Sequence, residues 1–200
     1  MLPSDIERAL QLVGELLAAR QVNFRIAVIG GSALNLLGLV SRATTDVDIL
    51  AFGKPPDTRG AIELGPPEEP LPAALSNAAA IVAKDLGLDP HWLNTGPASQ
   101  WQTGLPPGLE GRVHWRLYGG ALWVGIVDRY DLIFFKLYAA ADDRGPSSVH
   151  FQDLIALRPT DGELAAAASW VRSQDPGVDF GRTVSNVVSH AQQYRDRLRR

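Results

Sequence analysis

The chain has 200 residues, of which 46% are hydrophobic and 20% charged, and this composition excludes disorder along its whole length. It contains no cysteine, so disulfide scaffolds, thiolate zinc sites and cysteine nucleophiles are excluded, and its net charge of −3 gives no global basic field typical of nucleic-acid binding. No apolar run reaches the roughly 18 residues that cross a bilayer, and the N-terminus lacks the pattern of a signal peptide. We therefore expect a cytoplasmic protein without a membrane segment.

The first half of the chain has the pattern of a mixed helix and strand region. Ser4 and Glu7 have the spacing of a capping box before an apolar stripe, which predicts a first helix that covers a sheet. Prolines crowd residues 53–72 and predict a long surface loop without a regular element, and residues 94–111 form a second irregular stretch. The other expected elements are a strand over 24–29, a short helix over 33–39, a strand over 42–52 and a helix over 75–86.

The second half begins with a predicted β-hairpin, strands 112–118 and 121–127 around a Gly-Gly turn, and is helical afterwards. Asp128 is expected to cap the next helix, and Thr160 and Glu163 form another capping box. The expected helices cover 130–141, 149–157 and 164–171, and a last helix carries one apolar stripe through Val184, Val187, Val188, Ala191, Tyr194 and Leu198. This order predicts an α/β (α+β) fold, with a mixed sheet flanked by helices over 1–128 and a C-terminal helical region over 129–200 packed on it.

Four polar residues alternate along the strand predicted over 42–52. Arg42, Thr44, Asp46 and Asp48 would share one face of that strand, because side chains two residues apart point the same way. The α-carbons of the two aspartates would lie about 6.6 Å apart, and their carboxylates would repel by about 2 to 3 kcal/mol at an effective dielectric constant of 20. A cation between them would remove this repulsion, and an oxygen-only ligand set suits magnesium or manganese better than zinc. The alternative is a pair of solvated aspartates on an edge strand.

A glycine turn precedes these residues. Gly30-Gly31-Ser32 follows the strand predicted over 24–29 and opens a helix, so that backbone N–H groups converge where a phosphate would bind. By itself a Gly-Gly pair is more often only a tight turn. Together with the two aspartates downstream, the turn predicts a site for a metal-bound nucleoside triphosphate.

The stretch IGGSALNLLGLVSRATTDVDIL resembles the signature of the nucleotidyltransferase superfamily, in which a Gly-Gly/Ser turn, a helix and an Asp-x-Asp strand follow one another. Further along come Trp92-Leu93-Asn94, DLIFFKLYAAADDR over 131–144 and Asp153-Leu154. This ordered series is similar to the AbiEii-like nucleotidyltransferases, which include toxins of toxin–antitoxin systems. The resemblance extends from about residue 24 to residue 157 and implies a nucleotidyltransferase fold.

The resemblance also implies roles for individual residues. Asp46 and Asp48 would hold Mg²⁺ or Mn²⁺, and Lys136 and Asp153 match the lysine and aspartate of the later motifs. Gly31 and Ser32 would hold the triphosphate. Gly30 of the same turn, and Arg42 and Thr44 on the strand face of the two aspartates, are also expected to bind the nucleoside triphosphate.

Lys136 interrupts the apolar run LIFFKLYAA, and a cation there could stabilise the charge that develops during phosphoryl transfer. The alternative is a surface lysine that extends to solvent and pairs with Asp143. Replacement of Lys136 by alanine is expected to reduce turnover and hardly to alter melting. Asp153 could equally be a structural residue.

One feature departs from the superfamily pattern, which places a third carboxylate on a neighbouring strand. Residues 112–127 contain no Asp or Glu. Asp128 follows directly but is better explained as a helix cap, so we expect Asp153 to supply the missing carboxylate.

These patterns predict a metal-dependent enzyme that transfers a nucleoside monophosphate from a nucleoside triphosphate to a hydroxyl group and releases pyrophosphate. By resemblance, the acceptor is tRNA or a protein, and an antitoxin is an expected partner. One alternative is transfer to a small molecule. The other is a non-catalytic nucleotide-binding or partner-binding module of the same fold.

Overall fold

The computed structural model describes residues 1–56, 60, 62–143 and 145–198, without the side chain of Leu198. Residues 57–59 and 61 of the predicted loop and Arg144 of the quoted motif lie outside the described residues. The chain divides into two compact units, Met1–Asp128 and Arg129–Arg200. A mixed sheet with flanking helices confirms the predicted α/β (α+β) class.

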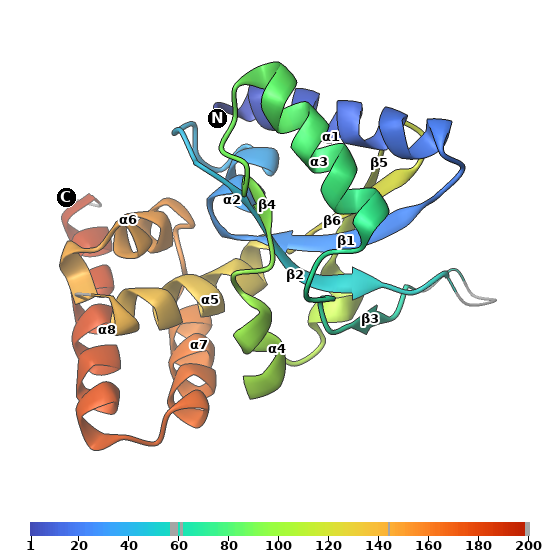
Figure 1. Ribbon diagram of the computed structural model, residues 1–200. Coiled ribbons are helices and arrows are strands. Elements are labelled where there is room, and N and C mark those ends of the chain that lie inside the picture. The colour runs from blue at the N-terminus through green and yellow to red at the C-terminus, as the bar shows by residue number, and fades with distance from the viewer. Residues whose placement is uncertain (57–59, 61, 144, 199–200) are drawn as a thin grey trace. The chain divides into compact units, whose positions relative to one another are not determined.

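The first unit contains one sheet in the order β3-β2-β1-β6-β5, with β4 paired to β2 (Figure 1). The central strand β1 runs parallel to β6 and antiparallel to β2, and β4 runs parallel to β2. The sheet is therefore mixed, as predicted. Its strands are β1 (Phe24–Ile29), β2 (Val47–Gly53), β3 (Leu64–Gly65), β4 (Leu93–Asn94), β5 (His114–Tyr118) and β6 (Leu122–Ile126).

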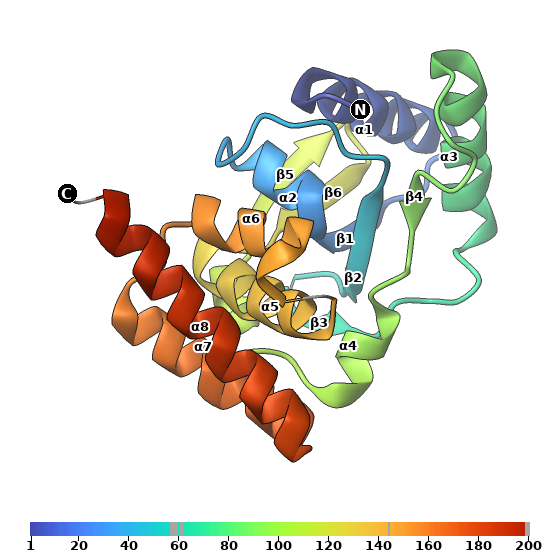
Figure 2. The same cartoon turned by 90° about the vertical axis from the view of Figure 1, so that its left-hand side faces the viewer.

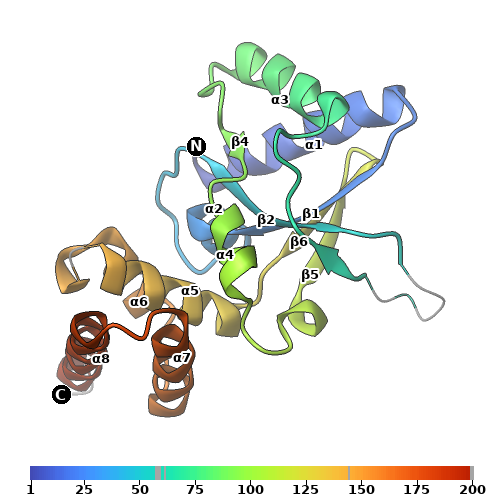
Figure 3. The same cartoon turned by 60° about the horizontal axis from the view of Figure 1, so that its bottom comes forward.

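Two long helices, α1 (Pro3–Ala19) and α3 (Ala73–Leu86), lie side by side over one face of the sheet (Figure 3). The apolar stripe of α1 is buried, as expected of a helix that covers a sheet. The predicted Ser4–Glu7 capping box is wrong. Pro3 opens the helix, and the N–H of Leu2 donates instead to Asp5 Oδ2 at 2.8 Å. Proline favours this first position because its missing N–H would have no partner there.

The strand predicted over 42–52 is shorter than expected, and β2 begins only at Val47. The reason is the lack of pairing partners, because β1 ends opposite Asp48 and β4 pairs only with Val47 and Asp48. Residues 42–46 nevertheless keep the expected alternation, since Ala43 and Thr45 are more exposed than their neighbours.

Both stretches predicted to be irregular contain short elements. Leu64–Gly65 pairs with the end of β2, just before two prolines stop the pairing. Helix α4 (Ala98–Thr103) fits between Pro97 and Gly104 because its six residues include no proline or glycine, and a 3₁₀ turn covers Leu109–Arg112. The expectation of no regular element in these stretches is therefore wrong.

The predicted hairpin is confirmed as β5 and β6. Gly119 and Gly120 both have positive φ, +53° and +80°, as a type I′ turn requires. The turn also packs tightly against α1, because a Cβ atom built on Gly14 would lie 2.1 Å from the carbonyl oxygen of Tyr118. Gly14 and the Gly-Gly turn thus hold the hairpin against the first helix.

The second unit is helical, as predicted. Ser148 caps α6 by accepting from Phe151 N–H at 3.1 Å, and Thr160 and Glu163 form the expected capping box of α7. Helices α7 and α8 lie side by side (Figure 2). The elements are α5 (Arg129–Asp142), a 3₁₀ turn (Gly145–Ser147), α6 (Val149–Ala156), α7 (Asp161–Gln174) and α8 (Val178–Leu198).

Helix α8 is the longest helix, yet no helix among the described residues is both long and apolar enough to cross a membrane. Val184, Val187 and Ala191 of its predicted apolar stripe are buried. Tyr194 is 45% exposed, which contradicts its placement in the buried stripe. The physical reason is an open cavity along this part of α8, which Tyr194 lines.

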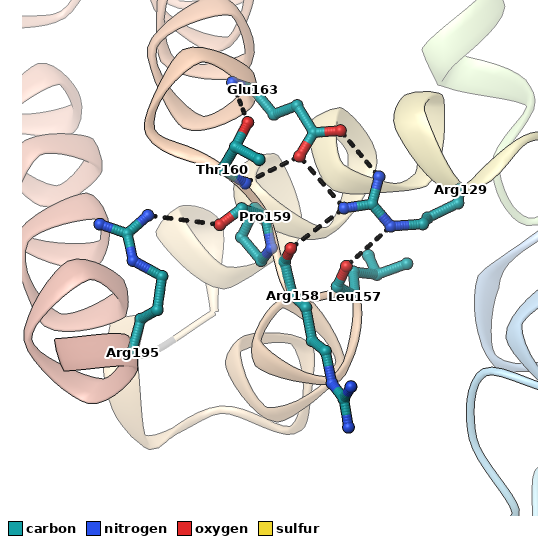
Figure 4. Close-up of polar contacts among 7 residues, drawn as sticks. All are labelled: Arg129, Leu157, Arg158, Pro159, Thr160, Glu163 and Arg195. Carbon is teal, nitrogen blue, oxygen red and sulfur yellow. Dashed lines mark hydrogen bonds and ion pairs between the residues drawn. The ribbon is translucent and has the colours of Figure 1, made fainter. Parts of the chain in front are cut away.

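Arg129 joins the start of α5 to the link between α6 and α7 (Figure 4). Its guanidinium donates to the carbonyl oxygens of Leu157 and Arg158 at 2.9 and 3.1 Å and to both carboxylate oxygens of Glu163 at 2.7 and 3.1 Å. Glu163 also accepts from Thr160 N–H at 2.7 Å. We call these five residues the Arg129 clamp. Its hydrogen bonds, above all those from Arg129, lower the pKa of Glu163 from 4.5 to about 2.

The Arg129 clamp predicts a loss of stability in acid. Because the pKa of Glu163 is lower in the folded state, its contribution is complete above about pH 4.5 and is lost as the pH falls toward 2. Denaturant unfolding of the wild type and of Glu163→Gln at several pH values should show a difference in unfolding free energy of up to about 3 kcal/mol at neutral pH. This difference should shrink toward pH 2, whereas Glu68→Gln, at an exposed position, should show no such trend. A constant difference for Glu163→Gln would contradict the assignment.

Candidate functional site

The pairing of β2 decides where the Asp48 side chain points. The β1–β2 register passes from Ala27–Ala51 to Val28–Ile49, so that Leu50 is an extra residue, a β-bulge. After the bulge, Asp48 stands opposite Ile29, the last residue of β1. Directly paired residues share a face of the sheet, so the Asp48 side chain lies on the same face as that of Ile29, next to the glycine turn that follows β1.

The glycine turn lies directly against the residues predicted to accompany it. Gly30 has a φ of +79°, and a Cβ atom built on it would lie 2.5 Å from Asp48 Oδ2. A Cβ atom on Gly31 would lie 3.0 Å from Thr44 Oγ1 and 3.5 Å from Arg42 Nη2. A side chain at Gly30 would therefore displace the Asp48 carboxylate, and Arg42, Thr44 and Asp48 all gather around the two glycines.

The segment 42–46 lies outside the sheet but is held in place by other contacts. Asn35, in the short helix α2 (Gly30–Leu36), donates from Nδ2 to the carbonyl oxygen of Arg42 at 2.9 Å, and Thr44 N–H donates to the carbonyl oxygen of Met1 at 3.0 Å. Thr44 Oγ1 makes a long contact of 3.4 Å to Asp46 Oδ1. Asp46 thus joins the group through Thr44. Asn35 is a polar residue within the apolar run ALNLL, a pattern that could have indicated a buried polar contact but was not used in the sequence analysis.

Ser32 uses its side chain inside the protein. Its hydroxyl donates to the carbonyl oxygen of Ile29 at 3.1 Å, and the residue is 1% exposed. The Ser32 hydroxyl therefore stabilises the strand-to-helix turn. Of the Ser32 groups, the backbone N–H is the one that could bind phosphate, as expected of this residue.

Asn94 is a second residue to which the sequence analysis assigned no role. It pairs with Asp48 across β4 and β2, and its Oδ1 accepts from Gly96 N–H at 2.7 Å. A Cβ atom on Gly96 would lie 4.0 Å from Asp48 Oδ1. The motif Trp92-Leu93-Asn94 contains this residue, and the pairing of β4 with β2 brings Asn94 beside Asp48.

Asp46 and Asp48 are the carboxylates beside the glycine turn that could contact a metal ion bound together with phosphate. Arg42, Thr44, Asp46 and Asp48 are all partly exposed. Within the described ranges, no three His, Cys, Asp or Glu side chains are grouped closely enough to hold a metal ion. Mg²⁺ is commonly held by one or two carboxylates plus substrate phosphates, and Asp46 and Asp48 could supply these carboxylates.

The hairpin strands carry no carboxylate, and their packing shows what stands there instead. A Cβ atom on Gly125 of β6 would lie 2.5 Å from Val113 Cγ1 and 2.9 Å from the ring of Trp115, so the indole covers this position. Asp128, expected to cap a helix, contacts His114 Nε2 through its Oδ2 at 2.8 Å.

Lys136 and Asp153 meet inside the second unit. Lys136 Nζ lies 2.7 Å from Asp153 Oδ2, and their side chains are 7% and 2% exposed. The alternative in which Lys136 extends to solvent beside Asp143 is therefore wrong, because α6 places a carboxylate over the buried side of α5. The structure thus brings together the predicted site residues as two groups, one within each unit.

Comparisons of the chain with protein-family models, with curated proteins and with solved structures give no match.

The arrangement of Asp46 and Asp48 beside the glycine turn predicts a metal site that depends on both aspartates. Asp46→Asn with Asp48→Asn should abolish Mn²⁺ binding measured by calorimetry in the presence of a non-hydrolysable nucleoside triphosphate. The fold should be unchanged or slightly stabilised, because like-charge repulsion disappears. Asp85→Asn, at an exposed position of α3, should bind like the wild type. Unchanged binding by the double variant would exclude the assignment.

Proposed function

We propose that this chain is a metal-dependent nucleotidyltransferase that transfers a nucleoside monophosphate from a nucleoside triphosphate to a hydroxyl acceptor. The observation that carries the proposal is the position of Asp48, whose carboxylate lies against Gly30 at the end of β1, with Arg42 and Thr44 around Gly31. A strand carboxylate, a glycine turn and an arginine in one place are suited to a metal-bound triphosphate.

In this proposal, the backbone N–H groups of Gly30, Gly31 and Ser32 bind the outer phosphates. Arg42 and Thr44 lie beside Gly31 and add a charged donor and a hydroxyl donor. Mg²⁺ or Mn²⁺, held by Asp46 and Asp48, would neutralise the triphosphate and orient it. The acceptor oxygen forms a bond to the α-phosphorus, pyrophosphate leaves, and the hydroxyl proton passes to a base, for which we propose Asp153. Lys136 would neutralise developing charge.

The acceptor class rests on the resemblance, which favours tRNA or a protein and an antitoxin partner. The net charge of −3 instead favours a small acceptor over RNA. A second candidate function is a non-catalytic nucleotide-binding module. It is favoured by the hairpin strands, which have no Asp or Glu, and by Trp115 over Gly125.

The decisive experiment incubates the full chain with each α-labelled nucleoside triphosphate, Mg²⁺ and a cell extract. We expect release of pyrophosphate and transfer of label to RNA, protein or a small molecule, which identifies the acceptor class. Asp48→Asn should abolish transfer, whereas Asp85→Asn should not. Nucleotide binding without transfer would favour the binding module, and the absence of both would overturn the proposal.

The burial of Lys136 and Asp153 changes what their substitution is expected to do. Removal of one partner leaves the other as an uncompensated buried charge, which typically destabilises a protein by about 3 to 5 kcal/mol. This replaces the expectation that Lys136→Ala hardly alters melting. A loss of activity in a single variant would therefore not separate a catalytic role from a structural one.

A paired substitution separates these roles. Lys136→Met with Asp153→Leu replaces the ion pair by apolar side chains, which is often neutral or stabilising, so this double variant should melt near the wild type and above either single variant. If the pair acts in transfer, the folded double variant should lose activity by about 10² or more. Asp128→Asn serves as a control and should have a mild effect. Full activity in the folded double variant would show that the pair is structural only.

A further inference from the structure

A cavity of about 490 Å³ lies within the second unit, between the link from α6 to α7 and the last turns of α8. Its volume is within the range of about 300 to 1,000 Å³ that is usual for small-molecule sites. Its walls include Ile155, Arg158, Pro159, Asp161, Tyr194 and Arg195.

One part of this cavity is apolar and includes flat surfaces. Ile155 and Pro159 contribute aliphatic surface. Tyr194 contributes an aromatic ring, and this residue is 45% exposed although it lies on the apolar stripe of α8. An exposed aromatic ring beside an apolar wall favours a flat apolar group as the occupant.

The polar part of the cavity is cationic. Arg158 is exposed, and its side chain has no hydrogen bond or ion pair with any of the residues that the structure describes. Two arginines and one aspartate line the cavity, so positive charge is in excess. An anion would pair with Arg158 without displacing an existing partner in the described part of the chain.

Arg195 is only partly satisfied. Its Nη2 donates to Asp161 Oδ1 at 2.7 Å, but its contact to the carbonyl oxygen of Pro159 is long, 3.5 Å. Its Nε is buried and has no hydrogen bond to the described residues, with Asp196 Oδ1 3.8 Å away. Arg195 therefore adds positive charge to the wall of the cavity, part of which Asp161 neutralises.

The backbone of Arg158 is held in an unusual conformation. Its φ is +48°, a left-handed backbone conformation that is strained for a non-glycine residue and more often found with glycine. The carbonyl oxygens of Leu157 and Arg158 both accept from Arg129, so the Arg129 clamp fixes this conformation (Figure 4). The side chain of Arg158 is thereby presented at the cavity from a fixed backbone.

We propose that this cavity binds a small molecule that joins one anionic group, a phosphate or a carboxylate, to a flat apolar body. Arg158 binds the anionic group, and Tyr194, Pro159 and Ile155 contact the body. The proposal does not depend on nucleotidyl transfer, because all of these residues belong to the second unit.

The test is a calorimetric titration of the full chain with phenyl phosphate and with benzoate, which differ only in the anionic group. Inorganic phosphate and phenol each supply one half of the ligand. Saturable binding of phenyl phosphate or benzoate, at least tenfold tighter than that of either half, is expected, and the better of the two identifies the anionic group.

Variants locate the binding. Arg158→Gln changes an exposed side chain without described partners, so the protein should fold, and binding should weaken at least tenfold. Tyr194→Ala should also weaken it. Arg182→Gln, an exposed arginine of the same helix as Tyr194, should bind like the wild type. Absence of saturable binding, equal binding of inorganic phosphate, or unchanged binding in Arg158→Gln would each overturn the proposal.

Discussion

The close approach of Asp48 to the backbone of Gly30 is the constraint on which the candidate site depends. One extra residue, Leu50, resets the pairing between β1 and β2, so that Asp48 stands opposite the end of β1. Gly30 then has to lack a side chain, because a Cβ atom there would overlap the carboxylate. A bulge and a glycine thus aim one charged group at a turn that offers backbone N–H groups, which is a common use of bulges near functional sites.

The charged side chains of the two units differ in how deeply they are buried, and this difference bears on their proposed roles. The polar residues around the glycine turn are partly exposed, so they can exchange water for a ligand at modest cost. Lys136 and Asp153 are buried and paired, which makes each of them strongly dependent on the other. The charged side chains of the Arg129 clamp are partly buried. Their hydrogen bonds lower the pKa of Glu163 and also hold the backbone of Arg158 at the cavity.

Several predictions failed where a distant partner outweighed a local pattern. Alternation along residues 42–52 favoured one long strand, but a strand extends only as far as it has neighbours, and β1 and β4 end the pairing near Asp48. The local pattern suggested Asp143, seven residues along the chain, as the partner of Lys136, whereas its partner Asp153 comes from α6. Ser4 was preferred as a cap because of its side chain, although Pro3 had already opened the helix. Local periodicity gives no information about contacts between residues that are far apart in the sequence.

The sequence by itself determined the mixed α/β class, the buried strand Phe24–Ile29, the hairpin with its Gly-Gly turn, and the helix that follows the Thr160–Glu163 capping box. Each of these follows from local periodicity, turn chemistry or capping. It also identified the residues that gather at the glycine turn. Only the tertiary structure decided the bulge at Leu50, the place of Asn94 beside Asp48 and the Lys136–Asp153 pair. These depend on strand register and helix packing, in which a shift of one residue changes the partner of every side chain.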